Sequence, residues 1–275
     1  MGHFNSKTLL RKPNFHRLTG VKSDIFLKMV KKLAPFWEQK LLKKNRSGRP
    51  FGVGGIEDHL LVLLIIYRCH ITQDFLACIF GVDKATICRS LKRIEPIAKR
   101  ILGVKRIIKI SEEEAEALLI DATEQTVERP KKRQKLYYSG KKKRHTIKAE
   151  IITTEKGRIV SVSKSSPGTV HDITMRRKGT PLPPQAKAYA DSGYQGYQEE
   201  HKNLEIPYKS SKNNPLTKDE KEYNHALSSF RVRIEHTIGK IKNFKILSER
   251  YRYAKNTHST KMAVVAGIVN LIAGF

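Results

Sequence analysis

The sequence predicts a mixed α/β protein in which an all-helical N-terminal region precedes a region of strands and helices. Apolar residues recur at helical spacing through residues 22–110. From about Leu118 the period changes, and the β-rich runs 145–154 and 158–164 flank a Glu-Lys-Gly turn that predicts a hairpin. Strands followed by helices are typical of α+β or α/β domains. We therefore expect two domains, residues 1–110 and residues 111–275.

The charge of the chain predicts a polyanionic partner. Its 275 residues include 54 Lys and Arg against 26 Asp and Glu, a formal net charge of +28. This excess is far above what solubility needs, and it favours nucleic acid over an anionic membrane surface. The hydrophobic content of 39% is enough for a folded core and argues against a disordered basic tail.

The three cysteines exclude a secreted disulfide scaffold. Cys69, Cys78 and Cys88 contain no Cys-x-x-Cys pair, so they also lack the spacing of a zinc site. We expect ordinary buried thiols in a reducing compartment.

Two apolar runs are too short to span a bilayer. Residues 60–67 form a run of eight and residues 263–275 a run of thirteen, whereas a spanning helix needs roughly 20 apolar residues. The N-terminus has no apolar stretch that could form a signal-peptide core. We interpret both runs as buried helices and expect a cytoplasmic protein with no membrane partner.

Capping and breaking residues predict the first helices. Ser23 is expected to cap a helix that Pro35 breaks or kinks. Residues 43–55 form a basic, Gly-rich connector, and a buried helix over 56–68 follows. Within the connector, Arg46-Ser-Gly-Arg-Pro50 resembles a minor-groove hook. We interpret it as a linker with an option of groove binding.

A short helix, a glycine turn and a longer basic helix come next. Thr72 caps the first helix, Gly81 ends it, Asp83 caps the second, and Pro96 marks a stop or restart. This arrangement over about 72–95 is typical of a helix-turn-helix and also of an ordinary helical hairpin with a solvated charged face. The charge excess favours DNA binding. The basic residues expected to contact DNA are Lys84, Arg89, Lys92 and Arg93.

The C-terminal region predicts short strands and two closing helices. Residues 118–120 and 186–190 are short apolar strands. Residues 204–209 form a further strand at an edge, because Pro207 cannot donate to a ladder. A long helix is expected from about Lys218 into the 240s, and a last helix over 261–275.

Three acidic residues stand out by their settings. Asp121 and Asp191 each follow a short apolar strand, and Glu235 lies in the long helix. An acid at a strand end is costly to bury unless a cation meets it. Taken singly, each is more commonly a cap or an ion-pair partner. Taken together, they fit a site for Mg²⁺ or Mn²⁺, and two such ions promote in-line phosphoryl displacement.

Five segments, in order, give the chain a family resemblance: 121–124, 138–148, 167–172, 190–196 and 231–235. Together they resemble the DDE transposases of bacterial insertion sequences, in the branch related to the Harbinger elements. Residues 55–102 resemble the helix-turn-helix region of that branch. The resemblance implies a ribonuclease-H-like catalytic domain over 111–275. It also implies a catalytic, metal-binding triad of Asp121, Asp191 and Glu235 that holds two Mg²⁺ or Mn²⁺ ions.

The family signature around the glutamate is matched by Arg231, Glu235 and Lys242, with Ser228 where the family has tyrosine. The resemblance implies that Arg231 and Lys242 hold phosphates of the transposon end. The motif His171-Asp172 also belongs to the family. Its role does not follow from the sequence, and we interpret His171 as structural.

Residues 129–148 form a second basic region. It contains ten basic residues and no acid, interleaved with Tyr137 and Tyr138. Such a composition suits backbone contact by cations together with stacking by tyrosine. The residues expected to contact phosphate are Lys141, Lys142, Lys143 and Arg144.

Three functions follow as hypotheses. The first is a DNA transposase that binds the ends of its own insertion sequence, cleaves them with metal ions and transfers their 3′-OH ends into target DNA. The others are a DNA-binding protein on a transposase scaffold without catalytic activity, and a metal-dependent DNA nuclease of the same fold. The complete acid triad favours the first. Its partners would be double-stranded DNA, as terminal inverted repeats and as target, and a second copy of the chain in a dimer or larger assembly. A bacterial or archaeal nucleoid location would follow.

Overall fold

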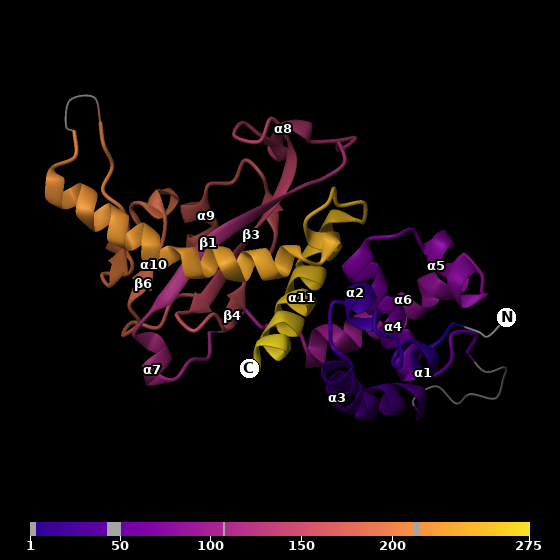
Figure 1. The fold of residues 1–275 in the computed structure, drawn as a ribbon. Helices are drawn as coiled ribbons and strands as arrows, with labels where there is room; N and C mark the ends of the chain where they lie inside the picture. Colours follow the sequence, from indigo (N-terminus) through magenta and orange to yellow (C-terminus); the bar gives the residue numbers. More distant parts are fainter. Residues whose placement is uncertain (1–3, 43–50, 107, 212–214) are drawn as a thin grey trace. The chain divides into compact units, whose positions relative to one another are not determined.

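The computed structural model describes residues 4–42, 51–106, 108–211 and 215–275 (Figure 1). They divide into two compact units. The first comprises residues 1–103 with the segments 242–249 and 267–275, and the second comprises residues 104–241 and 250–266. The first unit thus includes two C-terminal segments that a division at residue 110 leaves out. The Arg46–Pro50 motif lies outside the described residues.

The first unit is built from helices over its described part. α4 is its core helix, and Leu60 to Leu64 are fully buried, which confirms the expected buried helix over 56–68. The free thiols differ from expectation, because Cys78 on α5 is exposed and Cys69 and Cys88 are only half-buried. The helices are α1 (Ser6–Leu9), α2 (Phe15–Thr19), α3 (Ser23–Leu42), α4 (Ile56–Cys69), α5 (Gln73–Phe80), α6 (Lys84–Ile101) and the 3₁₀ turn η3 (Lys245–Leu247).

Two prolines lie inside helices. Pro35 lies within α3 and Pro96 within α6, so neither proline ends its helix. The expected break at Pro35 and the expected stop at Pro96 are therefore wrong. A proline removes one backbone hydrogen bond, whereas the buried faces continue on both sides of it. Leu33 and Trp37, for example, flank Pro35 in the core. Packing therefore outweighs the local penalty.

The second unit is a mixed sheet with the order β2-β3-β1-β6-β7, and β4 and β5 also pair with β3. β1 is antiparallel to β3 and parallel to β6, and β7 forms the predicted edge beyond β6. The β3–β4 hairpin is confirmed, as is the mixed α/β class with a helical region before the sheet. The strands are β1 (Leu118–Thr126), β2 (Tyr138–Ser139), β3 (Arg144–Thr154), β4 (Ile159–Val162), β5 (Ser166–Pro167), β6 (Ala188–Tyr189) and β7 (Leu204–Glu205).

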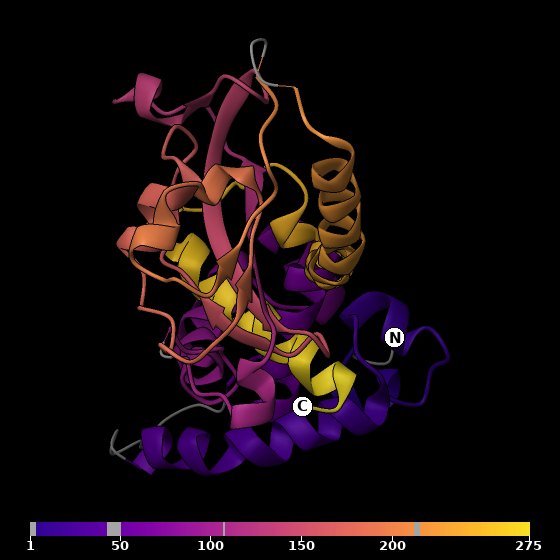
Figure 2. The ribbon, with the colours of Figure 1, turned by 90° about the vertical axis from the view of Figure 1, so that its left-hand side faces the viewer.

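The helices of this unit cover the sheet on both faces. Figure 2 shows α10 on one side of the strands and the short helices of residues 172–199 on the other. The helices are α7 (Glu112–Ala115), α8 (Gln134–Tyr137), α9 (Asp172–Arg177), η1 (Ser192–Tyr194), η2 (Tyr197–Glu199), α10 (Lys218–Lys242), η4 (Lys255–Thr257) and α11 (His258–Ala273), of which the part from Gly267 onward belongs to the first unit. None of the helices in the described ranges has both the length and the apolar character of a membrane span.

β1 is longer than expected, and Asp121 lies inside it rather than at its end. Its pairing with β3 runs from Leu118 opposite Thr154 to Thr126 opposite Thr146. β3 therefore supplies hydrogen-bond partners for the polar half of β1, which has no apolar run to mark it as a strand. Because side chains alternate along a strand, Asp121 lies on the face opposite Ile120, whose side chain joins the core beside η1 and η2.

His258 at the start of α11 is buried against β1. Its Nε2 lies 2.8 Å from Oε1 of Gln125 and its Nδ1 lies 2.7 Å from Oγ of Ser165. Burial, with the nearby positive charge of Lys261, lowers the pKa of His258 to about 4.

The low pKa of His258 predicts a loss of stability in acid. The unfolded chain binds this proton near pH 6.5, so the stabilisation that is complete above that pH is lost as the pH falls through about 4, by up to about 3 kcal/mol. Urea unfolding of wild type and His258→Gln between pH 7 and pH 4 measures the difference. We expect a smaller loss in the variant, and the same loss in both proteins would contradict the assignment.

Candidate active site

Two of the three predicted acids are brought together by the sheet. β1 and β6 are parallel neighbours with Leu119 opposite Tyr189, so Asp121 and Asp191 occupy equivalent places two residues further on. Asp191 also caps η1, and its Oδ1 accepts a hydrogen bond from the backbone N–H of Gly193 at 2.9 Å.

A third acid, Asp172, reaches the same place as the first residue of α9. A Cβ atom added to Gly193 would lie 2.9 Å from Oδ1 of Asp191 and 3.0 Å from Oδ2 of Asp172. Both carboxylates thus face the same glycine, and a side chain there would occupy the space between them. The Nζ of Lys148 lies 3.1 Å from Oδ1 of Asp172 and provides its counter-charge. We call Asp121, Asp172 and Asp191 the acid cluster.

The electrostatics of Asp121 are those of a half-buried carboxylate that a cation would stabilise. Burial, with smaller contributions from the negative charges of Asp191 and Asp172, raises its pKa to about 6. Arg231 and the N–H of Ala122, which donates to Oδ1 at 2.8 Å, act in the opposite direction.

Arg231 is the cation that faces Asp121 from α10. Its Nη2 lies 3.8 Å from Oδ1 of Asp121. Its Nε is buried and makes no hydrogen bond with the described residues. The guanidinium thus offsets part of the charge of the acid cluster and keeps one donor unused.

Glu235 is not part of the acid cluster in this structure. It is exposed on α10, four residues after Arg231, and therefore on the same face of the helix. Within the described ranges, no three His, Cys, Asp or Glu side chains are close enough together to hold a metal ion.

Sequence reasoning missed the placement of Asp172 and the burial of Tyr194. Tyr194 is 1% exposed. Burial and the charges of nearby acids, chiefly Glu150 and Asp172, raise its pKa well above the ordinary value. Both residues stand in motifs that were recognised, His171-Asp172 and residues 190–196. No spacing rule, however, connects position 172 with positions 121 and 191.

The helix-turn-helix elements form as predicted. The Oγ1 of Thr72 accepts from the N–H of Phe75 at 3.1 Å, and Gly81 ends α5 in the left-handed conformation at φ 63°. Asp83 is the N-cap residue of α6, although its side chain makes no capping bond to the backbone.

The residues predicted to contact DNA differ in their surroundings. Lys92 is exposed, Arg89 is exposed and bonds Thr86, and Lys84 pairs with Asp74 at 2.9 Å. Arg93 is half-buried, and its guanidinium lies 4.5 Å from the ring centre of Phe51. The remaining predicted contacts are exposed, namely Lys141, Lys142, Lys143, Arg144 and Lys242, whereas Arg231 is half-buried.

Comparisons with known proteins cover both parts of the chain. Residues 120–270 match the family model of the DDE superfamily endonuclease, and residues 55–103 match the model of the helix-turn-helix of DDE superfamily endonuclease. A probable transposase for insertion sequence element IS702 from Microchaete diplosiphon is 32% identical over 262 residues, 93% of each chain. A putative transposase for insertion sequence element IS112 from Streptomyces albus G is 24% identical over 222 residues, 80% of this chain and 81% of its own. No solved structure matches significantly.

Proposed function

The chain belongs to the DDE superfamily endonucleases, and from that premise we propose that it is an insertion-sequence transposase that cleaves the ends of its own element and joins their 3′-OH groups to target DNA. The observation that supports the chemistry best is the convergence of Asp121 and Asp191 on neighbouring parallel strands, in a chain of net charge +28. DNA phosphates and the carboxylates of the site repel each other, so cations have to lie between them.

We propose that Asp121, Asp191 and Glu235 hold two divalent cations, Mg²⁺ or Mn²⁺. The donor set fits these ions, because it consists of carboxylate oxygens. A cation would also relieve the unfavourable burial of charge that raises the pKa of Asp121. Such ions supply Lewis-acid stabilisation of the charge that develops on the phosphate oxygens.

The residues around the acid cluster have supporting roles in this proposal. Arg231 balances Asp121 in the free protein and holds a phosphate of the element end in the complex through its guanidinium. Lys148 offsets the negative charge of Asp172 through their ion pair. Lys242 and the exposed run from Lys141 to Arg144 contact the DNA backbone further away.

The proposal includes an assembly on DNA. Two element ends have to be held together for joining, so we expect a homodimer or a larger assembly on terminal inverted repeats and target DNA. The site of action is the bacterial or archaeal nucleoid.

Strand transfer distinguishes the three candidate functions. A pre-cleaved, labelled element end is incubated with supercoiled plasmid and Mg²⁺, and labelled plasmid products are scored on a gel. We expect labelled, joined products. Cleavage of an uncut end without any joining would favour the nuclease of the same fold. End binding without either step would favour a DNA-binding protein that lacks catalytic activity.

The helix-turn-helix proposal predicts a specific loss on Lys92→Ala. Its exposed ammonium is proposed to contact a phosphate, so its loss should lower the salt slope of end binding by about 1. Lys99→Ala removes the same charge from an exposed position of the same helix and should change the slope less. Fluorescence anisotropy with a terminal-repeat duplex at several salt concentrations makes the comparison, and equal slopes for the two variants would refute the assignment.

A further inference from the structure

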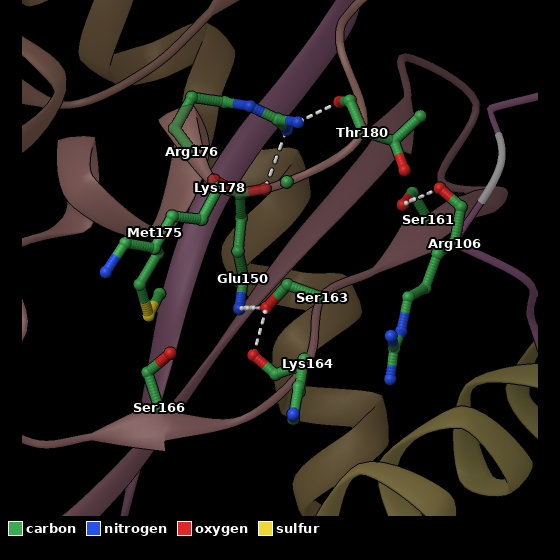
Figure 3. Close-up of a pocket in the computed structure, with 11 residues that line it drawn as sticks. Arg106, Glu150, Ser161, Ser163, Lys164, Ser166, Met175, Arg176, Lys178 and Thr180 are labelled. Atoms are coloured by element: carbon green, nitrogen blue, oxygen red, sulfur yellow. Dashed lines mark hydrogen bonds and ion pairs between the residues drawn. The ribbon is translucent and has the colours of Figure 1, made fainter.

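A cavity of about 370 Å³ lies between β4 and α9. β4 pairs with β3 alone among the described strands, so the cavity is at an outer edge of the sheet. Figure 3 shows Met175 and Arg176 of α9 on one side of it and Arg106 on the opposite side. No residue of the helix-turn-helix, of the acid cluster or of the basic run 141–144 contributes to its lining.

Three of the cations that line this cavity have no acidic partner among the described residues. Arg106, Lys164 and Lys178 are exposed lining residues, and none of them forms an ion pair within the described part of the chain. The hydroxyl groups of Ser166 and Thr180 add neutral donors. Like charges that converge in this way repel one another unless an anion lies among them. The lining is therefore suited to a ligand that is negatively charged and rich in oxygen.

The floor of the cavity is a buried, fixed ion pair. The Nη1 of Arg176 donates to Oε1 of Glu150 at 2.7 Å, and the two side chains are 1% and 3% exposed. Nη2 of Arg176 also donates to the carbonyl of Thr180. Nε of Arg176 is buried and makes no hydrogen bond with the described residues. Arg176 thus offsets the negative charge of Glu150. The remaining cations, Arg106, Lys164 and Lys178, give the lining of the cavity a net positive charge.

Gly179 lies beside this ion pair and lets the guanidinium of Arg176 come close to the backbone. A Cβ atom at Gly179 would lie 2.8 Å from Nη2 of Arg176. A side chain at this position would force the guanidinium of Arg176 to shift. The floor is therefore built by the backbone, the glycine and the pair together.

α9 connects the cavity to the acid cluster. Asp172 begins this helix, and the cavity residues Arg176 and Lys178 follow four and six residues later. At 1.5 Å per residue this separation is roughly 6–9 Å, which is short enough for the two places to contact neighbouring phosphates of one DNA strand. A volume of this size also lies within the usual range of ligand sites.

We propose that this cavity is a second phosphate-binding site for the DNA strand that passes the acid cluster. It holds a backbone phosphate that neighbours the phosphate at the acid cluster, between the side chains of Lys164, Lys178 and Arg106. This inference rests on the proposed function. It adds a contact that fixes the position of the strand relative to the acids.

The test uses end duplexes in which single phosphates near the cleavage position are replaced by uncharged methylphosphonates. Full-length wild type is compared with Lys164→Gln/Lys178→Gln. The control is Lys202→Gln/Lys221→Gln, which removes the same charge from exposed positions outside the cavity. Affinity is measured without divalent metal by fluorescence anisotropy, and cleavage of the unmodified duplex is measured in parallel with Mg²⁺.

We expect wild type and the control to lose affinity about tenfold at one or two adjacent methylphosphonates, as for the loss of a charge-assisted contact. The cavity variant should show no such loss at those positions, and its salt slope should be lower by about 2.

Three results would overturn the inference. If the cavity variant keeps the wild-type methylphosphonate pattern while cleavage proceeds, the cavity does not bind the DNA strand and the proposed function stands. If dAMP or pyrophosphate binds wild type but not the cavity variant, and both proteins show the same methylphosphonate pattern, the ligand of the cavity is a free phosphate compound and not the DNA strand. If wild type neither binds nor cleaves the end, the proposed function fails and the inference fails with it.

Discussion

Replacement of Asp121 or Asp191 by Asn is expected to abolish strand cleavage and to leave end binding intact or slightly tighter. Each substitution removes a proposed metal ligand, and the metal contributes several kcal/mol to the stabilisation of the transition state. A loss of about 4 kcal/mol corresponds to a rate decrease of about a thousandfold. Binding should hold or improve because a negative charge close to the DNA phosphates is removed.

Cleavage of a labelled terminal-repeat duplex and anisotropy with the same duplex measure the two effects. Asp219→Asn, at an exposed position in the first turn of α10, is the matched control and should cleave at the wild-type rate. Undiminished cleavage by Asp121→Asn or Asp191→Asn would refute their assignment as metal ligands.

The same substitution at Asp121 should stabilise the fold. Because the pKa of Asp121 is raised from 3.8 to about 6, the folded protein binds more protons than the unfolded chain in that window, and its stability falls as the pH rises through it. Above pH 6 the ionised carboxylate is a cost that asparagine removes. Thermal unfolding at pH 7.5 should therefore give a higher Tm for Asp121→Asn, and Mn²⁺ should raise the Tm of wild type more than that of the variant.

The largest effect on stability is expected from Arg176→Met. This change leaves the carboxyl group of Glu150 buried without its partner, and loss of one member of a buried ion pair costs roughly 3–5 kcal/mol. Burial already raises the pKa of Glu150 to about 7. The unpaired group should therefore become protonated at neutral pH, and the cost of Arg176→Met should grow as the pH rises.

A double-mutant cycle in urea separates the pair from its parts. Glu150→Gln/Arg176→Met has no buried charge at either position, so it should recover much of the stability that Arg176→Met loses. If the double variant were as unstable as Arg176→Met alone, packing of the arginine stem would be responsible instead of the ion pair.

Local signals predicted the elements that local interactions determine. Helix α4 follows from its apolar run, the α5–α6 turn from Thr72 and Gly81, and the β3–β4 hairpin from its glycine-containing turn. The acids Asp121 and Asp191 were selected because each follows an apolar strand, and parallel pairing of β1 with β6 places them side by side.

Features that depend on residues far apart in the sequence could not be predicted from local patterns. The second half of β1 is polar and is a strand because β3 lies beside it. Asp172 joins the acids only because α9 begins there, and Pro96 is accommodated because α6 is packed on both sides of it. The cavity residues Arg106 and Lys178 are ordinary surface cations in sequence, and only the fold brings them to one cavity.

The most direct test of the account is cleavage of a labelled duplex that carries the element's own terminal repeat, with and without Mg²⁺, by wild type and Glu235→Gln. Glu222→Gln, at another exposed position of α10, is the matched control. We expect Mg²⁺-dependent cutting at the element end by wild type and Glu222→Gln, and none by Glu235→Gln. Equal cutting by Glu235→Gln would exclude Glu235 from the metal site and direct attention to Asp172, and binding without cutting by wild type under any divalent metal would contradict the enzymatic proposal.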